Sequence, residues 1–263
     1  MLEKVDLTKK LSRADYEARL PGLQRRLHAL QGACADHKVT ALVVFEGWDG
    51  AGTDGAIHAL TNGLDPRRFR LHTTQAAQGA EEDYPWLRRF WLNTPAYGEM
   101  AIFDRSWYRR VLIERVEGLA SEMAWRKAYR DINEFEQSLA DDGVTIVKFW
   151  FHLSQGKQKR QAKKRRQDSA EGGLAHPDGW KHHKKYNEYL VAVEEMLERT
   201  DSKWGRWTLV PATSRWYARN LVLETVAARL EARLGDNRPT PEGADDSIAD
   251  DIRKAMEAAE SIL

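Results

Sequence analysis

The sequence predicts an α/β protein in which a five-stranded parallel sheet lies between two layers of helices. Helical patterns separate most of the short runs that are rich in β-branched and aromatic residues, and this alternation is typical of a parallel sheet. The runs contain few polar residues, as expected for strands that helices cover on both faces. They are Thr40–Phe45, Phe69–Thr74, Met100–Phe103, Val144–Phe151 and Trp207–Val210.

Long helices are expected before the first strand, before the fourth strand and after the fifth. The first covers Ser12–His37, with Ser12 as its N-cap. Pro21 is predicted to interrupt or kink this helix, because proline lacks the backbone N–H that a helix interior needs. The other two helices are expected over Glu122–Asp141 and Ser214–Leu234.

The segment between the fourth and fifth strands, residues 155–190, is expected to form a helical hairpin that acts as a lid over the end of the sheet. Its first half, Gln155–Gln167, has no large apolar residue, so such a helix must be solvated or lie against an anion. The second helix, Trp180–Arg199, carries a stripe of aromatic and aliphatic side chains. The basic residues of the first half are Lys157, Lys159, Arg160, Lys163, Lys164, Arg165 and Arg166.

Residues 1–235 are expected to form one domain that includes the lid, and residues 236–263 a linker and a terminal helix. The net charge of +1 indicates no class of partner, so local charge has to be considered instead. Cys34 is the single cysteine, which excludes an internal disulfide and favours a reducing compartment. Neither a secretory signal nor an apolar run long enough to span a membrane is evident, so we expect a cytoplasmic location.

The segment Phe45–Ile57 predicts a phosphate-binding loop between the first strand and a helix. Gly47 and Gly52 hold the two glycine positions of the pattern G-x-x-x-x-G-K-[ST]. Glycines let backbone N–H groups face an anion, and the helix N-terminus adds partial positive charge. A turn that only connects strand and helix is the alternative. The expected phosphate contacts are Gly47, Gly50, Gly52, Thr53, Asp54 and Gly55.

Two residues make this loop unusual. Thr53 stands where the pattern has a lysine, so the loop lacks the charge that normally binds phosphate oxygens. Asp49 places a carboxylate among phosphates, which is understandable if Asp49 holds Mg²⁺ directly or through water.

A second carboxylate, Asp104, ends the third predicted strand and should reach the same edge of the sheet. This is the position of the Walker-B acid that binds the metal in P-loop enzymes, so we expect Asp49 and Asp104 to hold one Mg²⁺. Arg105, Arg109 and Arg110 follow and would bind phosphate oxygens. Alternatively, Asp104 or a neighbouring serine caps a helix and the arginines are solvated.

The basic half of the lid suits a polyanion, although most charge runs are solvated faces. A single-stranded nucleic acid would require aromatic side chains between the charges, and this stretch has none. We therefore expect no nucleic-acid partner. His182 and His183 show no ligand spacing with other residues that would indicate zinc.

Several motifs together resemble the polyphosphate kinase 2 family, and their wording is nearest to the halves of polyphosphate:AMP phosphotransferases. The resemblance covers roughly residues 10–235 with the motifs in the family's order. The run of Phe, Asp, Arg, Ser, Trp and Tyr after a phosphate loop is highly specific. The matching motifs include Glu46-Gly-Trp-Asp-Gly-Ala-Gly52, Phe103-Asp-Arg-Ser-Trp-Tyr108, Val111-Leu-Ile-Glu-Arg-Val-Glu-Gly118 and Lys148-Phe-Trp-Phe-His-Leu-Ser154.

The resemblance implies a P-loop kinase sheet, similar to thymidylate kinase, with a helical lid. It implies reversible, Mg²⁺-dependent phosphoryl transfer between inorganic polyphosphate and a nucleoside mono- or diphosphate. Asp49 and Asp104 correspond to the metal-holding pair. The implied phosphate contacts are Arg89, Arg105 and Arg110, with Lys157, Arg160, Lys164 and Arg165 of the lid as the polyphosphate clamp. Relatives commonly assemble, so we expect a homo-oligomer by analogy.

The chain departs from the family at a few positions. Thr53 replaces the loop lysine, Arg109 replaces an asparagine or glycine, and Arg215, counted among the phosphate contacts, replaces a lysine. We hypothesise that Arg109 supplies the missing charge. The leading interpretation is an active kinase. The alternatives are a catalytically impaired relative that binds polyphosphate or nucleotide as a sensor or subunit, a nucleoside-monophosphate kinase that uses ATP, and a nucleic-acid binder.

Overall fold

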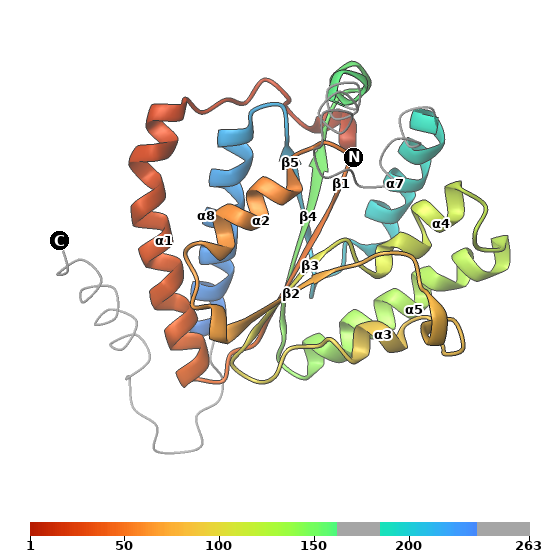
Figure 1. The fold of residues 1–263 in the computed structure, drawn as a ribbon, viewed down its shortest axis with the longest axis horizontal. Helices are drawn as coiled ribbons and strands as arrows, with labels where there is room; N and C mark the ends of the chain where they lie inside the picture. The colour runs from red at the N-terminus through yellow and green to blue at the C-terminus, as the bar shows by residue number, and fades with distance from the viewer. Residues whose placement is uncertain (162–184, 236–263) are drawn as a thin grey trace.

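A computed structural model describes residues 1–161 and 185–235 of the chain. Its centre is a parallel sheet of five strands in the order β2-β3-β1-β4-β5 (Figure 1). The predicted fold class is therefore confirmed, and each strand lies within one or two residues of its expected position. The strands are β1 (Ala41–Gly47), β2 (Phe69–Thr73), β3 (Met100–Asp104), β4 (Thr145–His152) and β5 (Trp207–Pro211).

Helices cover both faces of the sheet, which gives three layers (Figure 1). One face carries α1 (Arg13–Asp36), α2 (Thr53–Thr61) and α8 (Arg215–Gly235). The other carries α3 (Arg88–Trp91), α4 (Ile113–Val116), α5 (Glu122–Asp141) and α7 (Tyr186–Thr200). Single 3-10 turns are η1 (Leu2–Lys4), η2 (Pro66–Arg68), η3 (Gly79–Glu81) and η4 (Trp107–Arg110). Residues 155–161 are also helical.

The central strand β1 is buried along its whole length, whereas the edge strand β2 is partly exposed. This difference explains the apolar composition of β1, because parallel strands that are covered on both faces have no solvent side. The core is continuous through the sheet and both helical layers. Within residues 1–161 and 185–235, we find no helix that is both long enough and apolar enough to cross a bilayer.

The expected start of α1 is confirmed, because the Ser12 side chain accepts a hydrogen bond from the Asp15 N–H. The predicted interruption at Pro21 is wrong, since α1 continues through this residue. Pro21 lies on the exposed side of a 24-residue helix that is buried on its other side, so tertiary packing outweighs the lost hydrogen bond. The expected linker and terminal helix, 236–263, and most of the lid, 162–184, lie outside the described residues.

Candidate phosphate-binding site

The loop between β1 and α2 adopts the conformation that its glycines permit. Gly50 and Gly52 have φ angles of 78° and 90°, which other residues rarely adopt, and Gly52 is the N-cap of α2. The first N–H groups of a helix have no partner within the helix, so the start of α2 can donate hydrogen bonds to an anion. Thr53 is buried in this first turn, and its hydroxyl donates to Asp54 Oδ1 at 3.4 Å.

Trp48 anchors the loop to the opposite helical layer. Its ring stacks on Tyr186 of α7 with the centroids 4.5 Å apart, and its indole N–H donates to His152 Nδ1 at 3.1 Å. Burial lowers the pKa of His152, and Glu194 opposes this shift in part. The next residue, Asp49, is mostly buried with 9% of its surface exposed. The anchor therefore fixes the chain directly before the predicted metal ligand, and no sequence motif predicted it.

Asp104 lies where sheet topology predicted, at the carboxyl end of β3 and opposite Phe45 of β1. It is close enough to Glu46 for its charge to add to the effect of burial, which raises the pKa of the Glu46 carboxyl. The described residues contain no group of three or more His, Cys, Asp or Glu side chains that could hold a metal ion. Two carboxylates with water and substrate phosphates would still suit Mg²⁺.

Glu46 is a functional candidate that the sequence analysis missed. Its Oε1 accepts hydrogen bonds from the Ser106 N–H at 2.9 Å and the Ser106 hydroxyl at 2.8 Å. A charged residue at the end of an apolar strand was the available signal. Because Glu46 precedes the loop and Ser106 follows β3, these bonds hold the two halves of the site together.

Arg105 strengthens the same connection. Its Nη1 donates to the Gly47 carbonyl at 2.8 Å and lies 3.5 Å from Glu46 Oε2. The residue has a φ of 64°, a strained value for a side chain of this size, and such strain is concentrated at functional sites. Arg105, which was expected to bind phosphate, thus braces the loop.

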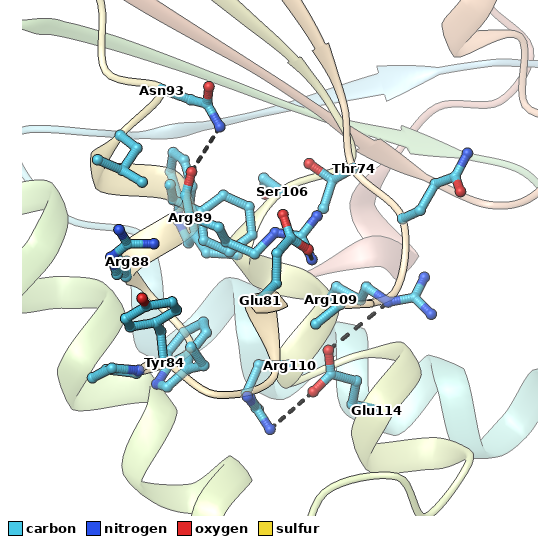
Figure 2. Close-up of a pocket in the computed structure, with 17 residues that line it drawn as sticks. Thr74, Glu81, Tyr84, Arg88, Arg89, Asn93, Ser106, Arg109, Arg110 and Glu114 are labelled. Carbon is cyan, nitrogen blue, oxygen red and sulfur yellow. Dashed lines mark hydrogen bonds and ion pairs between the residues drawn. The ribbon is translucent and has the colours of Figure 1, made fainter. Parts of the chain in front are cut away.

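A cavity of about 210 Å³ opens beside the end of β3, between the segment that follows β2, α3 and η4 (Figure 2). It adjoins Asp104, because the N–H of the lining residue Thr74 donates to the Asp104 carbonyl at 2.9 Å. Arginine side chains outnumber carboxylates in its wall, so the cavity suits an anion. The charged lining residues are Glu81, Arg88, Arg89, Arg109, Arg110 and Glu114.

The arginines of this cavity are held in place by carboxylates and aromatic rings (Figure 2). Arg89 Nη1 lies 3.0 Å from Glu81 Oε2. Arg110 Nη1 lies 3.0 Å from Glu114 Oε2, and the Arg110 guanidinium carbon lies 5.1 Å from the centroid of the Trp86 ring. Arg109 is buried, with its Nε 3.8 Å from Glu114. Glu114 therefore balances part of the charge that Arg109 was expected to supply to the loop.

The remaining predicted phosphate contacts lie elsewhere. Lys157 is half-buried and Arg160 exposed in the short helix 155–161. Arg215 is exposed at the start of α8, with its guanidinium over the Trp216 ring at 4.4 Å. Lys164 and Arg165, like His182 and His183, lie outside the described residues.

Comparison with known proteins identifies relatives over most of the chain. Residues 10–238 match the model of the family Polyphosphate kinase 2 (PPK2). The polyphosphate:AMP phosphotransferase of Pseudomonas syringae pv. tomato is 39% identical over 234 residues, covering 88% of this chain and 46% of the relative. The enzyme of the same description from Pseudomonas aeruginosa is 36% identical over 232 residues, covering 88% and 47%. The chain thus spans about half the length of these relatives.

The structural comparison gives the same result. The crystal structure of polyphosphate kinase 2 from Arthrobacter aurescens superposes with a TM-score of 0.83 at 27% identity. That match covers 97% of this chain and 93% of the other. The P-loop kinase fold expected from the sequence is therefore present.

Proposed function

This chain belongs to the polyphosphate kinase 2 family, and we propose that it transfers phosphoryl groups between inorganic polyphosphate and a nucleoside mono- or diphosphate. One observation carries the proposal. The glycine loop after β1, the acid that ends β3 and a cavity rich in arginine share one edge of the sheet. A kinase needs two anion sites that meet at the transferred phosphoryl group, and this arrangement offers both.

We assign the two sites to the two substrates. The loop and the start of α2 would hold the donor polyphosphate, because their N–H groups suit a chain of phosphates. Arg89, Arg109 and Arg110 would hold the phosphate of the acceptor nucleotide. AMP is the first acceptor to test, because the relatives at 39% and 36% identity are described as polyphosphate:AMP phosphotransferases.

Asp49 and Asp104 are proposed to hold Mg²⁺, which when bound would neutralise charge on the phosphate oxygens. The loop and the cavity arginines would position the acceptor oxygen in line with the donor phosphorus. Phosphoryl transfer depends mainly on such positioning and on charge stabilisation, so no covalent intermediate with the protein is required.

The test incubates the protein with Mg²⁺ and long-chain polyphosphate together with AMP, ADP, GMP or GDP, and repeats the series with ATP as donor. We expect product with polyphosphate as donor. Product with ATP alone would identify a nucleoside-monophosphate kinase instead. Binding of polyphosphate without product would support the second candidate function.

That second candidate is a catalytically impaired relative that binds polyphosphate or nucleotide as a sensor or subunit. Thr53 favours it, because loss of one preorganised donor typically lowers a rate by about 10²–10³. Wild type, Thr53→Lys, Arg109→Ala and the double variant should be compared in the transfer assay. A large gain for Thr53→Lys would support impairment, and an unchanged rate for Arg109→Ala would contradict compensation by Arg109.

Assembly and location belong to the same proposal. We propose a homo-oligomer by analogy with the family, which sedimentation velocity would test. We propose a cytoplasmic location because the single cysteine, Cys34, is a free thiol, which fits a reducing compartment. Imaging of a fluorescent fusion would test the location.

A further inference from the structure

A positive charge lies against the first turn of α2, and it comes from the distant helix α8. The side chain of Arg219 packs directly over Gly55, the third residue of α2. A Cβ atom at position 55 would lie 3.1 Å from both Cζ and Nε of Arg219, and closer still to Nη2. The guanidinium therefore occupies the space that a side chain at position 55 would fill.

Two aromatic residues hold this guanidinium in place. Tyr16 of α1 is 3% exposed, and its ring stacks on Trp216 with the centroids 5.1 Å apart. The Arg219 guanidinium packs over the Trp216 ring, 5.1 Å from its centroid, and lies near enough to the Tyr16 hydroxyl for its charge to act on that group. Burial raises the pKa of Tyr16, and the charge of Arg219 opposes this rise. Three helices thus contribute to one fixed position for the cation.

Arg219 differs from the cavity arginines in that no glutamate or aspartate of the described residues pairs with it. The cavity arginines Arg89 and Arg110 each lie 3.0 Å from a glutamate. The start of a helix carries partial positive charge, so a cation beside it is repelled. An anion bound between the guanidinium and the N–H groups of α2 would turn this repulsion into attraction on both sides.

We infer that Arg219 binds the polyphosphate chain at the loop, as a further phosphate-binding residue of the site proposed above. This inference rests on the proposed function. A guanidinium donates paired hydrogen bonds to phosphate oxygens and is always charged. Arg219 would thus supply a cation at a loop whose Thr53 supplies none. It serves the donor rather than the acceptor, because α8 lies on the opposite face of the sheet from α3 and α4 (Figure 1).

The position of Gly55 offers a way to move Arg219 without removing it. The atoms that a new Cβ would meet are the far end of a flexible side chain, so Gly55→Ala should displace the guanidinium at little cost. Alanine is also the better helix former. Gly55→Ala should therefore fold as stably as the wild type while it loses the phosphate contact.

The test measures binding of a linear polyphosphate of defined length and of AMP by calorimetry in Mg²⁺, with KM for both substrates. The variants are Arg219→Gln, Arg219→Lys, Gly55→Ala and Arg229→Gln, the last a control at an exposed position of the same helix. We expect Arg219→Gln and Gly55→Ala to weaken polyphosphate binding about tenfold or more, and Arg219→Lys to weaken it less. AMP binding and the melting temperature of the variants should stay near the wild-type values. The control Arg229→Gln should also bind polyphosphate as the wild type does.

Each outcome decides the inference. If Arg219→Gln and Gly55→Ala bind polyphosphate as tightly as the wild type does, the inference about Arg219 is overturned and the proposed function is unaffected. Equal losses for polyphosphate and AMP in the folded variant Gly55→Ala would also overturn the inference, because they would indicate a general disturbance of the site. A wild-type protein that neither binds nor uses polyphosphate would overturn the proposed function and this inference together.

Discussion

Gly47 ends β1 at a point where the backbone of β4 leaves no space for a side chain. A Cβ atom there would lie 2.6 Å from the Phe151 Cβ and 2.9 Å from the Phe151 carbonyl oxygen. Because backbone atoms cannot move aside cheaply, Gly47→Ala should lower the free energy of unfolding by about 1–3 kcal/mol. Urea denaturation measures the change.

Gly22→Ala is the matched control for this prediction. Gly22 lies in α1 with no heavy atom within 4 Å of a new Cβ, so alanine should raise stability by about 0.4–1 kcal/mol. Loss of stability at both positions would contradict the steric explanation.

His152 makes the anchor of the phosphate loop sensitive to pH. Its Nδ1 accepts the Trp48 indole N–H at 3.1 Å, which requires a neutral ring, and burial lowers the pKa of His152 from its ordinary value of 6.5. The unfolded chain therefore binds more protons than the folded one between 6.5 and the lowered value. The contribution of His152 to the free energy of unfolding should therefore be complete above pH 6.5 and should fall as the pH drops through this window.

The variant His152→Asn tests this pH dependence. Asparagine keeps an acceptor for Trp48 but does not titrate, so it should lose less stability than the wild type between pH 7.5 and pH 5. His28→Asn, at an exposed site in α1, should follow the wild-type profile in urea denaturation. Identical pH profiles for wild type and His152→Asn would contradict the assignment.

At the scale of elements, a buried polar cluster joins four segments beneath the site. Lys148 of β4 donates to Glu136 of α5 at 2.7 Å, to the Tyr108 hydroxyl of η4 at 2.9 Å and to the Thr200 carbonyl of α7 at 2.7 Å. Glu136 also accepts from the Tyr108 hydroxyl at 2.6 Å and the Trp107 indole N–H at 3.1 Å. The cluster thereby fixes η4, the turn that carries two of the cavity arginines.

Double-mutant analysis should reveal this coupling. Lys148 and Glu136 are both fully buried, so Lys148→Met or Glu136→Gln alone leaves the partner uncompensated and should cost about 3–5 kcal/mol. The double variant should cost clearly less than the sum of the two, because neither charge remains. Additive losses in urea denaturation would show that the two side chains act independently.

Local sequence patterns predict the helices and strands of this protein but not the contacts between them. All five strands and the long helices follow from apolar runs and cap residues, which act over a few positions. Lys148 could not be placed in the core by such patterns, because its partner Glu136 comes from another element. The error at Pro21 has the same origin, since packing of α1 outweighs a local preference.

The whole molecule explains why only part of the site was predictable. Asp104 and the loop follow β3 and β1, and parallel topology brings such strand ends to one edge. The bonds from Ser106 to Glu46 and from Trp48 to His152 span 60 and 104 residues, so no local motif could reveal them. Arg219 reaches the loop from the last described helix, and only the packing of α8 on α2 places it there.

The continuous core predicts that both helical layers unfold together as one unit. Leu27 of α1 and Met196 of α7 lie on opposite sides of the sheet, and each is 0% exposed. Leu27→Ala and Met196→Ala should each cost about 2–5 kcal/mol. Because both layers share the sheet, each variant should shift the same single transition to lower temperature.

Calorimetry and near-UV circular dichroism of the whole chain measure this cooperativity. Val191→Ala is the control within α7, because Val191 is 62% exposed and its truncation should change stability by less than about 0.5 kcal/mol. Two separate transitions, with Leu27→Ala lowering one and Met196→Ala the other, would contradict a single domain over residues 1–235. A common transition would mean that a change in either layer also affects the loop and the arginine cavity, because the sheet that positions both belongs to the same cooperative unit.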